Sequence, residues 1–339
     1  MSIIKIRSPR YETLTTPSGA LSAKLELSTG ATVAGLTLKY TIVKSCTAGQ
    51  TVSYEIAELV RDYLTPTITL DPANYPENQI KIRRVITFYD AANAGGSVVS
   101  GGNSVDYSGY DGYGTFMDGA NPTISATDIV YLFTPEYKTG GNVYNLYVPE
   151  GEGGAFQLID SSGEMGTQDF AAGDTSDTNR SVVVNFKRIN CTKYGAGRKI
   201  VFINKWGGVQ ELWFFLKKVE TTNAQSENYQ RNLINTSDAT NPTYDTKSHA
   251  ITTFNKQAKQ LHSLSSGYYP EWCNAWFEEL ILSEYVWMVR PKYSTPATNE
   301  IVPVTIKTSN LLHKTSVNDR LIEYTMEFEE SFDYINNVR

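Results

Sequence analysis

Cysteine and histidine are scarce in this chain of 339 residues, which has only three of each. The cysteines Cys46, Cys191 and Cys273 stand far apart and form no CxxC pair. Without such spacing, neither a disulfide framework nor a zinc site is indicated. We expect these thiols to be buried or incidental, in a chain made in a reducing cytoplasm.

Long hydrophobic runs are also missing. No apolar run approaches 18 residues, and the opening Met1-Ser-Ile-Ile-Lys-Ile6 lacks the apolar core of a signal peptide. We therefore expect neither a membrane span nor secretion by a signal peptide. A protein of this kind would leave a cell by lysis or as part of a particle.

The sequence lacks recognisable catalytic motifs. It has no GxSxG elbow, no Walker phosphate loop and no kinase signature, and the glycine-rich stretch 95–102 is not followed by Lys-Ser/Thr. No two histidines lie within five residues of each other, so we expect surface or capping roles for all three: His249, His262 and His313. The sequence leaves open a catalytic pair of carboxylates that only the fold brings together. Glu278 and Glu279 are not such a pair, because they are adjacent on an expected helix and point apart, and we expect both on the solvent face of that helix. We expect no enzymatic activity and no cofactor.

Positive charge is in short supply, with 30 Lys and Arg against 36 Asp and Glu, a net charge of −6. Phosphate recognition needs a surplus of basic side chains on one face, so no specific nucleic-acid binding is expected. Two groups of acidic residues could hold calcium, but neither has EF-hand spacing, and solvated loops are the favoured interpretation. The groups are Asp106, Asp111 and Asp118, and Asp160, Glu164, Asp169, Asp174 and Asp177. No metal site is predicted.

Aromatic residues are abundant, with 22 Tyr, 13 Phe and 5 Trp, and they favour strands and contact surfaces. Alternating patterns predict strands near 20–27, 36–42, 80–88, 129–133, 143–148, 302–306 and 322–328. Apolar stripes predict two short helices, near 54–63 and 270–282. The fold class expected is mainly β, with two or three sandwich- or barrel-like units and long loops.

Three domains are predicted from shifts in composition. The first, 1–122, is a β domain with a Gly/Tyr-rich loop; the second, 123–222, is a β domain that ends in a long hairpin; the third, 223–339, has a polar arm, a helix and a C-terminal β unit. We interpret 94–114 as a long mobile loop, 161–180 as a polar loop, and 223–249 as a loop or extended arm. Segments 94–114 and 223–249 exceed ordinary connections, so we expect both to be exchanged between subunits.

The strongest hairpin signal runs from Arg198 to Val219, with a turn at Asn204-Lys-Trp-Gly-Gly208. Its return strand, Leu212-Trp-Phe-Phe-Leu216, is apolar on both faces. Such a strand must be covered on both sides, so we expect it at the centre of a sheet or at a contact between subunits.

Tyrosines and glycines alternate in Tyr107-Ser-Gly-Tyr-Asp-Gly-Tyr-Gly-Thr-Phe116. Such a loop could stack on sugar rings or pack against a neighbouring subunit, and the composition of protein interfaces favours the neighbour. The candidate subunit-contact residues are Tyr107, Tyr110, Tyr113, Phe116, Trp206, Trp213 and Phe215.

Several segments in a fixed order resemble a known family. They are Arg7-Ser-Pro-Arg-Tyr11, Ser53-Tyr-Glu-Ile-Ala-Glu-Leu-Val-Arg-Asp-Tyr-Leu64, Val201-Phe-Ile-Asn-Lys-Trp-Gly-Gly208, Leu212-Trp-Phe-Phe215, Trp276-Phe-Glu-Glu-Leu-Ile-Leu-Ser283, Val286-Trp287, Ile301-Val-Pro-Val-Thr-Ile306, Leu321-Ile-Glu-Tyr-Thr-Met-Glu-Phe-Glu-Glu330 and Asn336-Asn-Val-Arg339. Together they resemble virion tail or neck structural proteins of tailed bacteriophages that infect Bacteroidetes, crAss-like phages among them.

The resemblance implies a structural subunit of a tail or neck that forms a homo-oligomeric ring or hub through which DNA passes. Its implied partners are further copies of itself and other tail or portal proteins of the virion, with no membrane involved. It implies no catalytic residues. The alternative functions are a receptor- or glycan-binding module at the tail tip and, more remotely, a glycan-cleaving enzyme.

Overall fold

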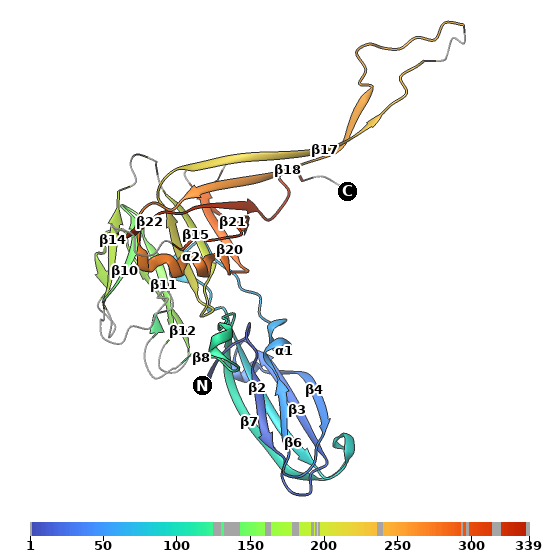
Figure 1. Ribbon diagram of the computed structural model, residues 1–339, viewed down its shortest axis with the longest axis vertical. Coiled ribbons are helices and arrows are strands. Elements are labelled where there is room, and N and C mark those ends of the chain that lie inside the picture. The colour runs from blue at the N-terminus through green and yellow to red at the C-terminus, as the bar shows by residue number, and fades with distance from the viewer. Residues whose placement is uncertain are drawn as a thin grey trace.

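The fold was analysed in a computed structural model, which describes residues 2–124, 130–131, 143–159, 164–177, 183–190, 193, 195, 197–235, 240–292, 294–295, 298–313 and 320–336. The chain is mainly β, as predicted. Figure 1 shows three parts: an elongated N-terminal unit, a broader body, and a long two-stranded arm that projects from the body.

The N-terminal unit is built on a six-stranded sheet in the order β4-β3-β6-β7-β1-β8. A two-stranded sheet, β2-β5, and the short helix α1 contribute to the same hydrophobic core, in which the buried hydroxyl of Tyr54 donates to the carbonyl of Ala23 at 2.7 Å. The elements are β1 (Ser2–Lys5), β2 (Tyr11–Thr15), β3 (Ser22–Gly30), β4 (Thr37–Ser45), β5 (Thr51–Glu55), α1 (Ala57–Arg61), β6 (Gln79–Tyr89), β7 (Val98–Tyr110) and β8 (Thr123–Ile124). Single 3-10 turns lie at η1 (Val33–Gly35), η2 (Pro72–Asn74), η3 (Ala92–Ala94) and η4 (Phe116–Asp118).

The prediction of a mobile loop at 94–114 is wrong, because most of this segment is strand β7, paired with both β6 and β1. Its small residues serve packing. A Cβ on Gly109 would lie only 2.8 Å from Cδ1 of Ile82 and 3.0 Å from Cγ2 of Ile6. Glycine is needed there because the neighbouring side chains lie directly over the strand. A strand with such glycines has the same composition as a flexible loop.

Two three-stranded sheets form the middle of the chain, in the orders β10-β14-β13 and β12-β11-β9. Part of segment 161–180, predicted as a polar loop, forms strands β12 and β13 instead. The elements are β9 (Val130–Tyr131), β10 (Val143–Pro149), β11 (Gly154–Ile159), β12 (Met165–Phe170), β13 (Ser176–Asp177) and β14 (Val183–Ile189). Residues 129 and 132–133 of the strand predicted at 129–133 lie outside the described residues.

A seven-stranded sheet forms the body, in the order β16-β15-β20-β21-β23-β18-β17. It takes strands from both sides of the domain boundary predicted at 222/223, which therefore runs through the sheet. Its strands are β15 (Arg198–Ile203), β16 (Val209–Phe214), β17 (Lys218–Gln230), β18 (Ile251–Ser265), β20 (Val286–Pro291), β21 (Asn299–Ile306) and β23 (Thr325–Glu330). The 3-10 turn η5 (Glu271–Cys273), the helix α2 (Asn274–Ile281) and the small sheet of β19 (Tyr269–Pro270) and β22 (Leu321–Ile322) complete the body.

The predicted hairpin at 198–219 is present as β15 and β16. Its apolar return strand β16 is buried, as its sequence requires, but it lies at an edge of the seven-stranded sheet and not at the centre. Leu212, Trp213, Phe214 and Phe215 are all buried in the largest hydrophobic core. The ring of Phe214 meets that of Phe277 on α2 at 6.3 Å and that of Phe328 on β23 at 5.5 Å, both nearly perpendicular. Such edge-to-face pairs add to the energy of burial and connect helix and sheet.

Both predicted helices are present and shorter than expected. α1 covers five residues within 54–63, because Tyr54 belongs to strand β5. α2 covers eight residues and buries Trp276, Phe277 and Leu280 of the predicted apolar stripe. Trp272, predicted on the same stripe, is 40% exposed.

Replacing Phe214 with Asp should destabilise the body severely. The change removes two aromatic contacts and buries an unpaired carboxylate, so we expect a loss of at least about 4 kcal/mol of unfolding free energy. Chemical denaturation followed by circular dichroism measures it. The same substitution at the almost fully exposed Phe116 is the control and should change the unfolding free energy little. A Phe214→Asp protein as stable as the parent would show that the ring is not in the core.

Candidate assembly surfaces

The arm formed by β17 and β18 is the most exposed feature of the structure. The two strands pair antiparallel from Lys218 opposite Leu264 to Gln230 opposite Ile251. Beyond them the ribbon continues, with a hydrogen bond from Arg231 N to Ala250 O of 2.8 Å. The described residues of segment 223–249 therefore form an extended arm, one of the two forms predicted for it, and Figure 1 shows the arm leading away from the body.

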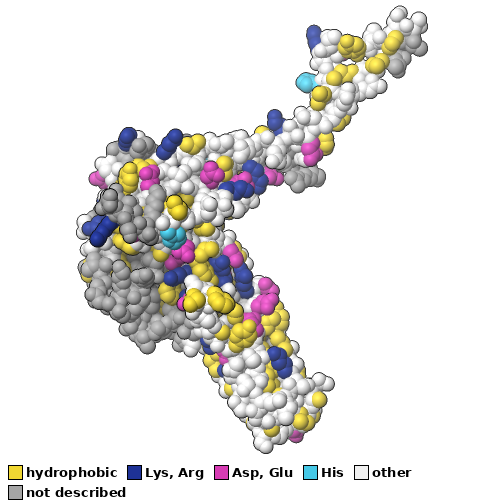
Figure 2. Space-filling model, in the orientation of Figure 1, with side chains coloured by type: hydrophobic (Ala, Val, Ile, Leu, Met, Phe, Trp, Pro, Cys, Tyr) yellow, Lys and Arg dark blue, Asp and Glu magenta, His cyan; other side chains and the backbone are white. Residues whose placement is uncertain are grey.

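Apolar side chains line the arm without a core beneath them. The rings of Tyr229 and Phe254 meet edge to face at 5.8 Å, and about half of each side chain remains exposed. Figure 2 shows apolar side chains on the surface along the arm. The large exposed ones are Val219, Tyr229, Ile234, Tyr244, Ile251 and Phe254. Surface of this kind along a ribbon is typical of a segment that packs against another chain.

The arm is fixed to the body by a buried charged cluster. His262, on β18, is fully buried, and its Nε2 lies 3.1 Å from Oε1 of Glu330 on β23. Arg290, on β20, contacts the same carboxylate, and its Nε donates to Glu300 at 2.9 Å. The surface role predicted for His262 is wrong, because two neighbouring strands provide the partners that make its burial tolerable. His249 and His313 are exposed, as expected.

A second exposed apolar feature is the turn η4, here called the Phe–Met turn (Phe116–Asp118). Phe116 is 97% exposed and Met117 90%. The turn is held in shape: Thr115 N donates to Oδ2 of Asp118 at 2.7 Å, and Gly114 N donates to Oγ of Ser8 at 2.7 Å. Two large apolar side chains on a preorganised turn favour a contact with another molecule.

The seven predicted contact residues divide into three groups. Phe116 is exposed, and Tyr113 and Trp206 are half-buried where the N-terminal unit meets the body. The remaining four are buried within the subunit: Tyr107 and Tyr110 on β7, Trp213 on β16, and Phe215 just after it. Tyr107, Tyr110 and Phe215 are enclosed by their own subunit and cannot touch a neighbour in this conformation, whereas Trp213, although buried, lines a pocket described below.

Lysines and a buried glutamate meet at the junction between the N-terminal unit and the body. Nζ of Lys5 lies 4.0 Å from the centroid of the Trp206 ring, and burial, assisted by the nearby Lys205 charge, lowers the pKa of Lys5 to about 8. Glu279, on α2, accepts from the backbone N of Lys205 at 3.4 Å. Burial raises the pKa of Glu279 to about 7, although Lys205 opposes this shift. The solvent-facing position predicted for Glu279 is therefore wrong, whereas Glu278 is exposed.

A second charged group lies at the same junction. Arg7 donates to the carbonyl of Leu282 at 3.2 Å and pairs with Glu284, which also pairs with Arg61. Burial raises the pKa of Asp111 to about 6 against the attraction of Arg7. These contacts join Arg7 and Arg61 of the N-terminal unit to the residues that follow α2.

Three of the acidic residues considered for calcium have partners within the chain. Asp106 pairs with Arg83 at 2.7 Å, Asp118 caps the Phe–Met turn, and Glu164 pairs with Lys81 at 2.5 Å. Asp160 lies outside the described residues. Among the residues that the structure describes, no cluster of three or more His, Cys, Asp or Glu could hold a metal ion.

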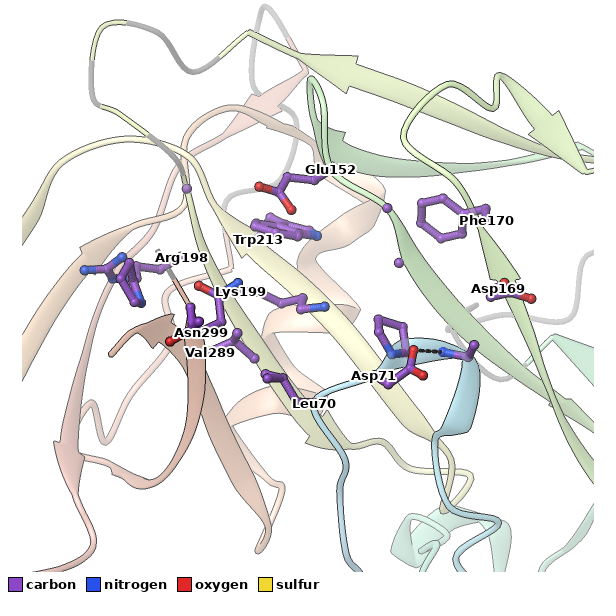
Figure 3. Close-up of a pocket in the computed structure, with 17 residues that line it drawn as sticks. Leu70, Asp71, Glu152, Asp169, Phe170, Arg198, Lys199, Trp213, Val289 and Asn299 are labelled. Carbon is purple, nitrogen blue, oxygen red and sulfur yellow. Dashed lines mark hydrogen bonds between the residues drawn. The ribbon is translucent and has the colours of Figure 1, made fainter. Parts of the chain in front are cut away.

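A pocket of about 590 Å³ opens where the body sheet meets the middle strands and the segment before η2. Figure 3 shows the indole of Trp213 lying between the side chains of Glu152 and Lys199, with Asp71 and Asp169 on the opposite wall. Sequence reasoning missed this pocket, because its residues come from seven separate segments of the chain.

Comparisons with known proteins do not assign the chain. A scan against protein-family models finds no match, and a search of curated proteins finds none either. In the described residues, no helix is both long enough and apolar enough to cross a membrane.

The raised pKa of Glu279 predicts how stability depends on pH. As the pH rises, the unfolded chain loses the proton of this carboxyl near pH 4.5, whereas the folded chain keeps it until about pH 7. Stability should therefore fall between about pH 4.5 and pH 7 and level off above, and Asp111 should add a smaller fall below pH 6. Glu279→Gln imitates the protonated form, so it should flatten this fall and raise the unfolding free energy at pH 8 by roughly 3 kcal/mol at most.

Urea denaturation at pH 5, 6, 7 and 8 measures the effect. Glu278→Gln, on the exposed neighbour, is the matched control and should leave the pH profile unchanged. A Glu279→Gln protein that is less stable than the parent at pH 8 would show that the ionised carboxylate, held by Lys205, stabilises the junction.

Proposed function

We propose that this protein is a structural subunit of a tailed-phage tail or neck, assembled with further copies of itself into a ring through which DNA passes. The observation that carries this proposal is the arm: a long, partly apolar ribbon that finds no covering surface in the described part of its own chain. The resemblance of the ordered segments along the chain supplies the phage context.

Physical reasoning favours an arm that docks on a neighbouring subunit. A two-stranded ribbon is marginally stable in water, because it buries little apolar surface by itself. Contact with a neighbour covers the apolar side chains and offsets the entropy lost when the arm is ordered. Repeated head to tail, one such contact closes a ring when the rotation between subunits allows.

The arm also presents free strand edges. β18 pairs with β23 only from Leu261 to Ser265, so beyond the body both edges of the ribbon lack a described third strand. A bulge at Ser226/Glu227, with Asn255 at a φ of +48°, interrupts the pairing. Bulges bend strands and discourage unselective pairing of edges, which suits an arm with one intended partner.

The tail-tip alternative loses its main support. It rested on a Tyr/Gly loop that could stack on sugars, but Tyr107 and Tyr110 are buried in β7. Of the proposed loop, Thr115 and Phe116 are exposed, and Phe116 with the neighbouring Met117 forms an apolar pair that fits a protein partner better than a polar sugar.

Shortening the arm should abolish self-assembly and leave the subunit folded. Residues 226–256 would be replaced by Asn-Gly, which joins the paired residues Gln225 and Gln257 through a two-residue turn. We expect the parent to form a closed oligomer and the shortened protein to be monomeric in native mass spectrometry. Unchanged thermal unfolding of the body is the control. An oligomer of unchanged mass would contradict the proposal.

Changing the Phe–Met turn tests a second contact. Phe116→Ser with Met117→Ser removes two exposed apolar side chains, so the subunit's own stability should change by less than about 1 kcal/mol. Binding to the partner that covers the turn should weaken at least tenfold. Incorporation of tagged protein into particles reports the loss, with Tyr63→Ser, another exposed aromatic position, as the control. Normal incorporation would show that the turn stays exposed in the assembly.

A further inference from the structure

We propose that the pocket beside Trp213 receives the outer part of the arm from a second copy of the chain, through Arg231 and Lys247. This inference rests on the proposed function and adds the place where the arm docks. It follows from the interactions that the pocket and the arm each lack within one subunit.

The pocket carries a surplus of negative charge. Its two basic side chains already have partners, because Lys199 pairs with Glu211 at 3.0 Å and Arg198 with Glu220 at 3.3 Å. Three carboxylates remain: Asp71, Glu152 and Asp169. That of Asp71 accepts only from Ala73 N and the Asn74 amide, and no described Lys or Arg pairs with any of the three. A ligand that enters the pocket should therefore be cationic.

An independent observation shows that the pocket also needs hydrogen-bond acceptors. Trp213 is 95% buried, and its Nε1, like Nε of Arg198, has no partner among the described atoms. A buried N–H without an acceptor is energetically unfavourable, and a bound acceptor would remove that cost. A peptide with basic side chains fits all these demands, because its carbonyls accept while its cations meet the carboxylates.

The outer arm presents such a peptide. Arg231 and Lys247 are both exposed, and neither forms an ion pair within the part of the chain that the structure describes. Aromatic side chains at Tyr229 and Tyr244 flank them. The thirteen residues of β17 span about 40 Å at the usual rise of a strand.

The arm leads away from the body in Figure 1, whereas the pocket lies within the body, so an arm in this conformation reaches the pocket of another copy and not its own. A neutral sugar would also find donors and acceptors in the pocket. It would, however, leave all three carboxylates without a counter-charge, which favours the peptide.

Charge reversal on each side, alone and combined, tests the contact. The arm variant is Arg231→Glu with Lys247→Glu, and the pocket variant is Glu152→Lys with Asp169→Lys. Each should raise the dissociation constant of the oligomer at least tenfold, as measured by mass photometry over a range of concentrations. All four changes in one chain should restore assembly to within about threefold of the parent, because every reversed arm then meets a reversed pocket.

The control reverses two exposed lysines outside both surfaces, Lys187→Glu with Lys217→Glu, which matches the charge change of the arm variant. It should leave the dissociation constant unchanged, and circular dichroism checks that every variant is folded. Failure of the combined variant to recover, when both separate variants are folded, would overturn the inference.

Two further outcomes separate this inference from the proposed function. If neither reversal weakens assembly although the shortened arm still abolishes it, the arm docks elsewhere: the proposed function stands and this inference fails. If a neutral oligosaccharide changes the fluorescence of Trp213 while the pocket variant still assembles normally, the pocket is a glycan site and the inference is overturned.

Discussion

The anchoring of β18 in the seven-stranded sheet is the interaction on which the rest of the arrangement depends. From Ala258 to Leu264, inside the body, this strand alternates buried and half-buried residues, and it holds His262 against Glu330 of β23. The residues before Ala258, in the arm, have only β17 as a described neighbouring strand. One continuous strand therefore joins a closely packed core to an exposed ribbon. We infer that the body serves as the rigid support and the arm as the part that seeks a partner.

The junction between the N-terminal unit and the body has a related design. Lys5, Lys205 and Glu279 meet there around the ring of Trp206, and burial shifts the pKa of Lys5 and of Glu279 toward neutrality. Charged groups in such positions are costly unless they are paired, and they fix the relative placement of the parts that supply them. The Phe–Met turn lies next to the same junction, and hydrogen bonds to Ser8 and Asp118 hold it in place. Fixed placement of the arm and the turn is what the proposed repeating assembly would require.

Much of the fold could be predicted from local pattern, and most of the site could not. The hairpin of β15 and β16 was predictable because Leu212 to Phe215 are apolar on both faces, a pattern that requires burial on both sides. Strand β7 was missed because its glycines, which allow close packing against Ile82, have the composition of a loop. The burial of His262 and Glu279 was missed because their partners, Glu330 and Lys205, lie 68 and 74 residues away in the sequence. Periodicity reports burial by neighbours along one element, but it carries no information on which distant charges compensate one another.

The position of the arm in the assembled state is the measurement that tests the central claim most directly. Subunits labelled with ¹⁵N would be mixed with unlabelled ones, assembled, cross-linked through lysines and analysed by mass spectrometry. The account predicts cross-links from the arm lysines Lys247 and Lys256 to the body of a copy with the other label. Arm cross-links that join only identically labelled peptides, or a protein that remains monomeric when concentrated, would contradict it.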